Sequence, residues 1–364
     1  MNILTINAGS SSIKCSLIGN DNALIAGVSL PAPNDVETEK QLINFIEGLP
    51  QINAIGHRIV HGGKRFTSPV VITGDIEDEL YALFDIAPLH NPPALAIVKM
   101  LCGLYPSIPS VACFDTTFFV NMPKAASTYA VVQEWRDKFD IHRYGFHGLS
   151  HAYACAKAAE LLGQPFEDLR LVSCHLGSGA SLAAIANGQA LDTTMGFTPL
   201  EGLVMATRVG SFDPGALLWV IRHGDLDLKA VEETLEHRSG LLALAGTAEL
   251  KEIIKKANSN EPRAVLALSV YLHRLRSGIA SMAASLGGLD VLIFTGGAGQ
   301  ASPQLRNDAC AGLDFLGIIL DPALNQTATD ADKIVSSAKS NIAISVVQAR
   351  EDIQIAQAVR EVLH

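Results

Sequence analysis

Residues 2–18 read NILTINAGSSSIKCSLI, two β-prone runs joined by a tip of small residues at 8–12. Such a pattern predicts a β-hairpin. Residues 170–185, RLVSCHLGSGASLAAI, repeat it around a tip at 175–179, and QALDTT at 189–194 follows as a third strand-like run. Two strand–loop–strand units about 170 residues apart in one chain predict a duplicated domain.

Helical patterns and one buried strand complete the outline. SHAYACAKAAELL at 150–162 ends at a glycine, and 263–286 is a longer helical pattern that ends at two glycines. DVLIFT at 290–295 is a short continuous apolar run, typical of a strand in a covered sheet. The last twelve residues, 353–364, have an amphipathic helical pattern. Strands mixed with helices throughout predict an α/β fold.

Composition limits the class of protein. A length of 364 residues with 48% hydrophobic content predicts two domains, with a site in the cleft between them. The 37 acidic and 27 basic side chains, without a Lys/Arg-rich run, argue against nucleic acid and an anionic membrane as partners. Six cysteines without a CxxC pair favour reduced thiols and no structural zinc. With neither a basic–apolar leader nor an apolar run of about 20 residues, we expect a cytoplasmic protein.

Three glycine-rich segments are predicted to be loops, and they offer the closely spaced backbone N–H groups that phosphate oxygens require. The first, residues 7–12, adds hydroxyl groups and is followed by Lys14. The second is the tip at 175–179. The third, 295–299, follows the buried apolar run, and α/β proteins bind ligands at such strand ends. Each alone is compatible with an ordinary turn, but together they predict a nucleotide or polyphosphate ligand.

Cationic side chains stand beside glycines at two further places. Arg58 lies in GHRIVHGG and Arg208 in ATRVG, where a guanidinium can counter charge on a transferring phosphoryl group. Most arginines are solvated surface groups, so that alternative stays open for each. Histidines gather at His90 in PLHNP and at 142–151 in HRYGFHGLSH, with a structural role as the alternative.

Two carboxylates are candidates for a metal site. Phosphoryl transfer calls for Mg²⁺ held by one or two carboxylates. Asp115 in FDTTFF ends an apolar run, and Glu351 in AREDIQIA begins the terminal helical pattern. Either can equally be a cap at a strand or helix end, and the sequence leaves both interpretations open.

Eight motifs occur together in one order: NAGSSSIK, HRIVHGG, PLHNP, FDTTF, YGFHGLSH, HLGSGAS, DTTMGFTPLEGLVMATR and FTGGAG. As a set, spread from residue 2 to about 352, they resemble the acetate/propionate kinase family of the actin-like, sugar-kinase-like superfamily. The resemblance implies an α/β fold of two duplicated actin-like, ribonuclease H-like domains flanking a nucleotide cleft. It implies an acyl-substrate domain at 1–119 with 353–364, and a nucleotide-binding and dimerisation domain at 120–352.

The resemblance also carries roles onto matching positions. The magnesium ligands, with Mn²⁺ as an alternative ion, are expected to be Asn7 and Glu351. Catalytic roles fall on Arg58, Asp115, His147, Arg208 and His90. The apolar pocket beside Arg58 for the methyl group is expected from Val60, Leu89, Phe146 and Pro199. ATP or ADP is expected to contact Ser10, Ser12, Lys14, His175, Leu176, Gly177, Ser178, Gly179, Glu249, Leu250, Lys251, Gly297, Ala298, Gly299, Gln300 and Ala301.

The expected reaction is reversible phosphoryl transfer between ATP and acetate, giving acetyl phosphate and ADP, by a homodimer. Several positions depart from the family pattern: Ser178 replaces Asn, Glu249 to Lys251 replace Asp-Met-Arg, and Gln300-Ala301 replace Glu-Asn. Because these positions concern the donor, pyrophosphate or another nucleotide is an alternative donor. Propionate or another short-chain carboxylate is an alternative acceptor. A catalytically silent nucleotide-binding regulator is the alternative from another class.

Overall fold

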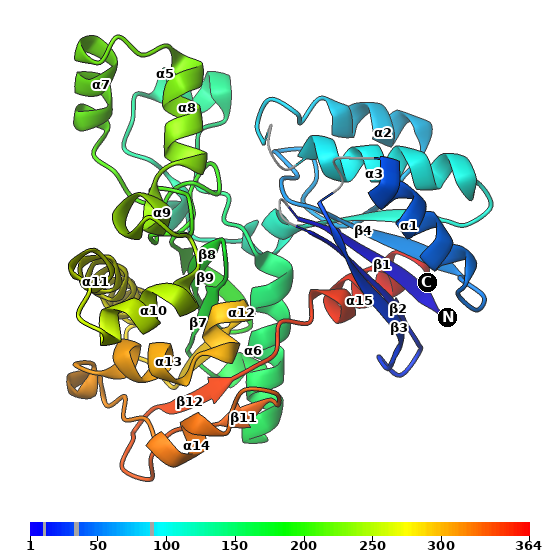
Figure 1. Ribbon diagram of the computed structural model, residues 1–364. Coiled ribbons are helices and arrows are strands. Elements are labelled where there is room, and N and C mark those ends of the chain that lie inside the picture. The colour runs from blue at the N-terminus through cyan, green and yellow to red at the C-terminus, as the bar shows by residue number, and fades with distance from the viewer. Residues whose placement is uncertain (10–11, 33–35, 88–90) are drawn as a thin grey trace. The chain divides into compact units, whose positions relative to one another are not determined.

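The chain divides into two compact units in the computed structural model, which describes residues 1–364 apart from 10–11, 33–35 and 88–90 (Figure 1). The first unit consists of Met1–Val120, Phe146–Tyr153 and Arg350–His364, and the second of Asn121–Gly145 and Ala154–Ala349. The predicted domain boundaries, 1–119 with 353–364 and 120–352, and the cleft between the domains stay predictions.

The first unit is built on a six-stranded sheet of order β3-β2-β1-β4-β6-β5. Its strands are β1 (Ile3–Ala8), β2 (Ser12–Ile18), β3 (Leu24–Pro31), β4 (Ala54–Ile59), β5 (Val70–Val71) and β6 (Ser110–Phe114). β1 to β3 form an antiparallel meander, β1, β4 and β6 run parallel, and β5 is antiparallel to β6. The hairpin predicted at 2–18 is confirmed as β1 and β2.

Helices pack on both faces of this sheet. They are α1 (Val36–Glu47), α2 (Gly74–Tyr81), α3 (Asn91–Leu104) and α15 (Glu351–Leu363), with a 3₁₀ turn η1 (Asp115–Phe119) after β6. Alternate residues of β1 face opposite sides, so Ile6 packs with residues of α1 and α3, whereas Ile3 packs with residues of α15. Gly56 in β4 allows α15 to come close, because a Cβ there would lie 2.5 Å from Ile355 Cγ2.

The second unit repeats the first topology. Its strands are β7 (Leu171–Leu176), β8 (Ala180–Ala186), β9 (Gln189–Thr193), β10 (Val291–Thr295), β11 (Lys333–Ile334) and β12 (Ala343–Val346). The order β11-β12-β10-β7-β8-β9, read in reverse, matches the first sheet strand for strand. The meander, the parallel pairs and the antiparallel edge strand all recur. The predicted duplication and α/β fold are therefore confirmed.

Many more helices accompany this second sheet. The longer ones are α5 (Gln133–Phe139), α6 (Gly148–Leu162), α7 (Pro214–His223), α8 (Leu228–His237), α10 (Leu250–Asn258), α11 (Pro262–Ser285) and α13 (Pro303–Cys310). The shorter ones are α4 (Lys124–Ser127), α9 (Gly240–Ala245), α12 (Gly296–Ala301), α14 (Pro322–Gln326), η2 (Phe166–Asp168) and η3 (Asp314–Leu316). Helices predicted at 150–162 and 263–286 correspond to α6 and α11. No helix in the described ranges is both long and apolar enough to cross a bilayer.

The third glycine-rich segment is not a loop. The sequence prediction of a loop at 295–299 is wrong from Gly296 onward, where α12 begins directly after β10. Only Gly296 has a positive φ, 77°, so the chain turns at this one residue. The glycine and alanine residues that follow have room to continue as a helix, and their small side chains leave the space beside α12 open.

Candidate active site

The carboxyl ends of the parallel strands in the first unit carry one polar cluster. Asn7 is next to last in β1, Arg58 is next to last in β4, and Asp115 follows β6 directly. Neighbouring parallel strands bring such residues to one edge of a sheet. Glu351 joins them from the first residue of α15, the helix that packs on Gly56. We call Asn7, Arg58, Asp115 and Glu351 the Arg58 cluster.

Arg58 makes the central contacts of this cluster. Its Nε donates to Asp115 Oδ1 at 3.0 Å and its Nη2 to Asp115 Oδ2 at 2.5 Å, which forms a bidentate ion pair. Its Nη1 donates to Asn7 Oδ1 at 2.9 Å. Asn7 Nδ2 in turn donates to Glu351 Oε2 at 3.2 Å. The four side chains therefore form one continuous run of hydrogen bonds.

Solvent is largely excluded from the ion pair, in which the Arg58 side chain is 12% exposed and that of Asp115 is 1% exposed. Burial lowers the pKa of the Arg58 guanidinium, but the charge and hydrogen bonds of Asp115 and the charge of Glu351 outweigh burial and raise the pKa overall. Arg58 is therefore a permanent cation. A guanidinium has five N–H groups. Within the described residues, the bonds to Asp115 and Asn7 use three of them, which leaves two for a ligand.

His147 reaches the cluster through its backbone. Its amide nitrogen donates to Asp115 Oδ2 at 3.3 Å, and its φ of 58° lies in the left-handed region that few non-glycine residues adopt. The next residue must be glycine, because a Cβ at position 148 would lie 2.1 Å from the carbonyl oxygen of Asp115. Close approach to Asp115 thus explains the His-Gly pair of YGFHGLSH. Of the neighbouring histidines, His151 is fully buried in the first unit and His142 lies in the second.

The predicted methyl pocket is partly described. Val60 and Phe146 are both buried in the first unit. In the sequence, Val60 is two positions after Arg58, and Phe146 directly precedes His147. Pro199 belongs to the second unit. Leu89 and the catalytic candidate His90 lie outside the described residues. The pocket as a whole therefore stays a prediction.

Asn7 and Glu351 fit the chemistry of a magnesium site. An amide oxygen and a carboxylate are the hard oxygen ligands that Mg²⁺ binds, and Mg²⁺ usually keeps several waters. The 3.2 Å hydrogen bond brings the two side chains together. Because Asn7 Oδ1 already accepts from Arg58, an ion must use the second lone pair of this oxygen or replace that bond. Among the residues that the structure covers, no group of three or more His, Cys, Asp or Glu side chains could hold a metal.

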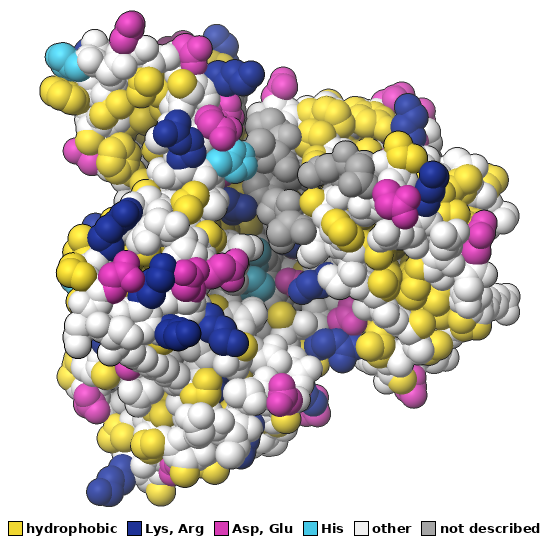
Figure 2. All heavy atoms as spheres, viewed as in Figure 1, with side chains coloured by type: hydrophobic (Ala, Val, Ile, Leu, Met, Phe, Trp, Pro, Cys, Tyr) yellow, Lys and Arg dark blue, Asp and Glu magenta, His cyan; other side chains and the backbone are white. Residues whose placement is uncertain are grey.

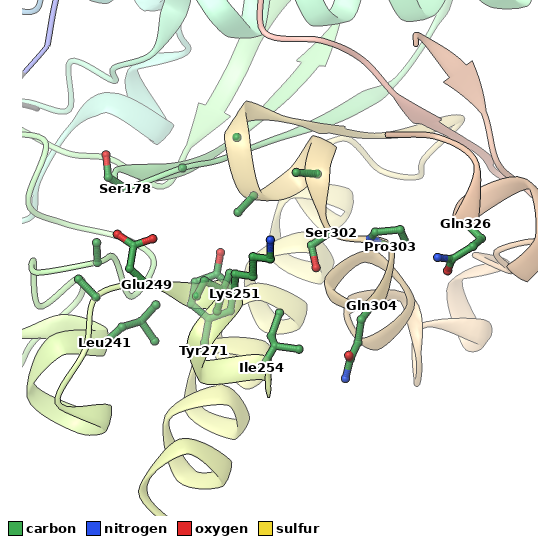
Figure 3. A pocket seen from close by; sticks show the side chains of 17 residues that line it. Ser178, Leu241, Glu249, Lys251, Ile254, Tyr271, Ser302, Pro303, Gln304 and Gln326 are labelled. Atoms are coloured by element: carbon green, nitrogen blue, oxygen red, sulfur yellow. The ribbon is translucent and has the colours of Figure 1, made fainter. Parts of the chain in front are cut away.

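The second unit contains a pocket of about 650 Å³ beside α12, which we call the α12 pocket (Figure 3). Its volume lies in the range of small-molecule sites. Residues near the ends of β7 and β10 and on α10, α11 and α13 line it. Eight predicted nucleotide contacts are among the lining residues, namely Gly177, Ser178, Glu249, Leu250, Lys251, Gly297, Ala298 and Ala301.

Other predicted nucleotide contacts of the second unit do not line the α12 pocket. These are His175, Leu176, Gly179, Gly299 and Gln300. Leu176 and Gly299 are buried and pack against each other, with a Cβ at Gly299 placed 3.5 Å from Leu176 Cβ. The side chain of Gln300 is held elsewhere, because its Nε2 donates to the carbonyl oxygen of Thr329 at 3.2 Å.

The remaining nucleotide candidates belong to the first unit. Lys14 is exposed on β2 and lies directly opposite Asn7 of β1. Directly opposite residues of antiparallel strands share a face of the sheet, so the Lys14 ammonium is on the face of the Arg58 cluster. Ser12 begins β2, and Ser10 lies outside the described residues.

Tyr271 is a lining residue that the sequence did not reveal. It is 4% exposed and belongs to α11, and its hydroxyl has no hydrogen-bond partner among the residues that the structure describes. Burial raises the pKa of this phenol, so the hydroxyl remains protonated and can donate. Figure 3 shows the side chains of Tyr271, Glu249 and Lys251 gathered in one part of the α12 pocket. From the sequence, a tyrosine within this long helical pattern could not be distinguished from an ordinary core residue.

Arg208 is held by contacts within the second unit. Its Nη1 donates to the carbonyl oxygen of Pro199 at 3.1 Å, and its Nε lies 3.4 Å from Glu236 Oε2. Burial raises the pKa of Glu236, whereas the charges of Arg208 and His237 lower it, and burial has the larger effect. Glu236 was not predicted, because nothing in the sequence pairs a carboxylate of α8 with an arginine 28 positions earlier.

Comparison with known proteins gives consistent matches along the chain. The model of the Acetokinase family matches residues 34–357, a range that includes Arg58, Asp115, His147, Arg208 and Glu351. The acetate kinase of Rippkaea orientalis is 44% identical over 357 residues, covering 98% of this chain and 86% of the relative. That of Dictyoglomus thermophilum is 38% identical over 391 residues, covering 98% of each chain.

Solved structures give the same result for the fold. The crystal structure of Porphyromonas gingivalis acetate kinase matches with a TM-score of 0.90 and 33% identity, covering 100% of both chains. The crystal structure of a propionate kinase from Francisella tularensis subsp. tularensis matches with a TM-score of 0.89 and 32% identity, covering 98% of both. The expected family and fold class are both confirmed.

Proposed function

Because the chain belongs to the acetokinase family, we propose that its reaction is reversible phosphoryl transfer between ATP and acetate, giving acetyl phosphate and ADP. It is a phosphotransferase with a carboxyl group as acceptor, EC 2.7.2.1. The observation that carries the proposal is the Arg58 cluster, in which a largely buried arginine keeps two N–H groups available beside oxygen ligands for a metal. A carboxylate is the partner that a planar guanidinium binds best.

The acceptor needs no general base. A carboxylic acid of pKa near 4 is ionised at pH 7, so its oxygen can attack the γ-phosphorus directly. One P–O bond forms to the acetate oxygen, and the bond from the γ-phosphorus to the bridging oxygen of ADP breaks. In this scheme Asp115 keeps Arg58 oriented through the bidentate pair, and Arg58 holds the acetate carboxylate with its remaining N–H groups.

Asn7 and Glu351 would hold the divalent ion, Mg²⁺ or alternatively Mn²⁺. When bound, such an ion offsets the negative charge of the phosphate oxygens. The adjacent Lys14 adds an ammonium on the same face of the first sheet. Arg208 and His147 are assigned to the charge that develops on the equatorial oxygens of the transferring phosphoryl group.

The nucleotide is assigned to the α12 pocket. Its lining combines apolar side chains such as Leu241 and Ile254 with polar ones such as Ser178 and Lys251. This combination suits adenosine, which has an apolar ring face and polar ring and ribose atoms. The unpartnered hydroxyl of Tyr271 is a donor that a nucleotide acceptor atom can satisfy after a small adjustment of the neighbouring side chains.

We further propose a cytoplasmic homodimer. Apolar side chains at the surface of the second unit support it, since Leu218 and Trp219 on α7 are 52% and 61% exposed. Figure 2 shows hydrophobic side chains at the surface over α7. We expect light scattering after gel filtration to give twice the chain mass, and Trp219→Glu to give one chain mass. A single chain mass for the unaltered protein would refute the dimer.

The test of the reaction is formation of acyl phosphate, trapped with hydroxylamine, from a panel of donors and acids. We expect one hydroxamate per ADP with ATP, Mg²⁺ and acetate. Faster turnover with propionate would support the second candidate, which the match to a propionate kinase structure favours. One methylene in an apolar pocket is worth only about 1–3 kcal/mol, so both acids should react.

Donor preference is resolved by the same panel. Lys251 and Gln300 replace common family residues, so GTP and pyrophosphate are tested beside ATP. If pyrophosphate were the one donor of the panel that supports turnover, the α12 pocket would no longer be assigned as the donor site. Tight ATP binding without turnover on any acid would instead favour a silent nucleotide-binding regulator.

A further inference from the structure

The segment from Thr194 to Gly202 in the second unit has neither helix nor strand, so its backbone depends on other groups for hydrogen bonds. Arg143 supplies two of them at the beginning of the segment. Its Nη1 donates to the carbonyl oxygens of Thr194 at 3.1 Å and Met195 at 3.0 Å. A side chain from 51 positions earlier thus fixes the start of this segment.

Glu201 closes the other end of the same segment. Its Oε1 accepts from Arg143 Nη2 at 3.0 Å, and its Oε2 accepts a short hydrogen bond from the Tyr129 hydroxyl. The Tyr129 oxygen accepts in turn from the backbone N–H of Phe197 at 3.1 Å, in the middle of the segment. We call Tyr129, Arg143 and Glu201 the Glu201 network.

The network lies so close to the backbone that only glycine fits at position 196. A Cβ there would lie 1.9 Å from Glu201 Oε2 and 2.0 Å from the Tyr129 oxygen. The carbonyl oxygen of Gly196 also accepts from the N–H of Tyr144 at 3.0 Å. The geometry of the segment is therefore held by the Glu201 network and by the backbone N–H of Tyr144.

This segment supports Arg208. The carbonyl oxygen that accepts from Arg208 Nη1 at 3.1 Å is that of Pro199, which lies between Phe197 and Glu201. Arg208 also contacts Glu236 Oε2 at 3.4 Å, longer than an ordinary hydrogen bond, and its Nη1 donates to Met205 Sδ at 3.9 Å. The Pro199 carbonyl oxygen makes the shortest of these three contacts, so a shift of the 194–202 segment would shift the guanidinium with it.

We propose that the Glu201 network positions Arg208 for phosphoryl transfer, and that Tyr129, Arg143 and Glu201 are positioning residues for the reaction. The inference rests on the proposed function, because it takes Arg208 to act on the transferring phosphoryl group. A misplacement of about 1 Å in a charge-stabilising group can lower turnover about 100-fold.

Tyr129→Phe is the most selective test. It removes the donor to Glu201 and the acceptor of the Phe197 N–H, but it keeps the ring, which lies 5.4 Å from the Arg143 guanidinium carbon. We expect kcat to fall about tenfold, while KM for ATP changes less than about twofold. The matched control is Tyr81→Phe, which removes a tyrosine–glutamate hydrogen bond on α2 and should leave kcat unchanged.

A double-mutant cycle separates positioning from general damage. If Tyr129 acts through Arg208, Tyr129→Phe should lower kcat less than about twofold in an Arg208→Ala background. Arg143→Lys, which keeps the charge but loses the paired contacts, should behave in the same way and serves if one variant fails to fold. Equal losses in both backgrounds would overturn this inference alone. Full activity of Arg208→Ala would overturn the assigned role of Arg208 together with the inference.

Discussion

The two units share one strand order but differ at equivalent positions along the same sheet edge. In the first unit the fifth residues of β1 and β4 are Asn7 and Arg58, and in the second the fifth residues of β7 and β10 are His175 and Thr295. Asp115 follows β6, whereas Val347 follows β12. The first edge is thus lined by charged and amide groups, and the second by smaller or less charged ones.

This difference indicates how a duplicated fold divides one reaction. The carboxyl edge of a parallel sheet is a general position for ligands, but the side chains at that edge decide which ligand binds. Charge at the first edge suits a carboxylate and a metal. Small residues at the second edge, together with Gly297 and Ala298 of α12, leave space for the base and ribose of a nucleotide. Four predictions test this division, beginning with the largest effect.

Arg58→Ala should lower kcat/KM for acetate on the order of 1000-fold, because it removes the proposed carboxylate contact and leaves Asp115 buried without its cation. Steady-state acyl hydroxamate assays measure the loss, and circular dichroism checks folding. Arg65→Ala is the control, since the Arg65–Glu79 pair of the same unit is exposed and should matter little. Similar losses in both variants would contradict a special role for the cluster.

Asp115→Asn should lower kcat by about 10- to 100-fold without abolishing turnover, because the amide keeps one acceptor for Arg58 and no proton must be removed. The dependence of kcat on pH is the decisive measurement. We expect the variant and the unaltered enzyme to have profiles of the same shape. If a fall in kcat toward low pH were present in the unaltered enzyme and absent only in the variant, Asp115 would instead be assigned as a general base.

Ala298→Leu should raise KM for ATP about tenfold and leave KM for acetate unchanged. Ala298 lines the α12 pocket, so three additional carbon atoms reduce the space for the nucleotide. The control is Ala323→Leu on α14, because Ala323 is exposed and does not line the pocket. A rise in KM for acetate alone would place the acceptor, not the donor, in this pocket.

His57→Phe should reduce the loss of stability in mild acid. His57 is the fourth residue of β4, and its equivalent in β10 is Phe294. In the described part of the chain, neither ring nitrogen of His57 has a hydrogen-bond partner. Burial lowers the pKa of His57 from 6.5 to about 3. Between these pH values the unfolded chain binds a proton that the folded protein does not, so stability falls as pH decreases.

Urea unfolding at pH 7.5 and pH 5.5 measures this effect. We expect the unaltered protein to lose about 1.4 kcal/mol more stability than His57→Phe between these two pH values. Equal losses would mean that His57 is not a neutral buried group in the folded protein.

The sequence predicted the strands and hairpins well because their signals are local. The β-prone runs around small tips at 8–12 and 175–179 predicted the β1–β2 hairpin and the meander of the second unit, and the apolar run at 290–295 predicted β10, whereas β3 was not predicted. Arg58, Asp115, Asn7 and Glu351 were predicted individually, mainly through the family resemblance. Their hydrogen-bonded arrangement needed the structure, because Asn7 and Glu351 are 344 positions apart.

Residues whose role depends on tertiary contacts could not be predicted from local sequence patterns. Glu201 lies 72 positions from Tyr129, and Glu236 meets Arg208 only because α8 packs beside it. The left-handed backbone of His147 follows from its contact with Asp115, not from its residue type. The glycine-rich residues 296–299 were predicted to form a loop, although only Gly296 turns the chain.

Calorimetric titration of a non-hydrolysable ATP analogue into the unaltered protein, Arg58→Ala and Ala298→Leu tests the division between the two units most directly. The account predicts that Arg58→Ala binds the analogue within about threefold of the unaltered Kd, whereas Ala298→Leu binds it at least about tenfold more weakly. Loss of analogue binding in Arg58→Ala with full binding in Ala298→Leu would contradict it.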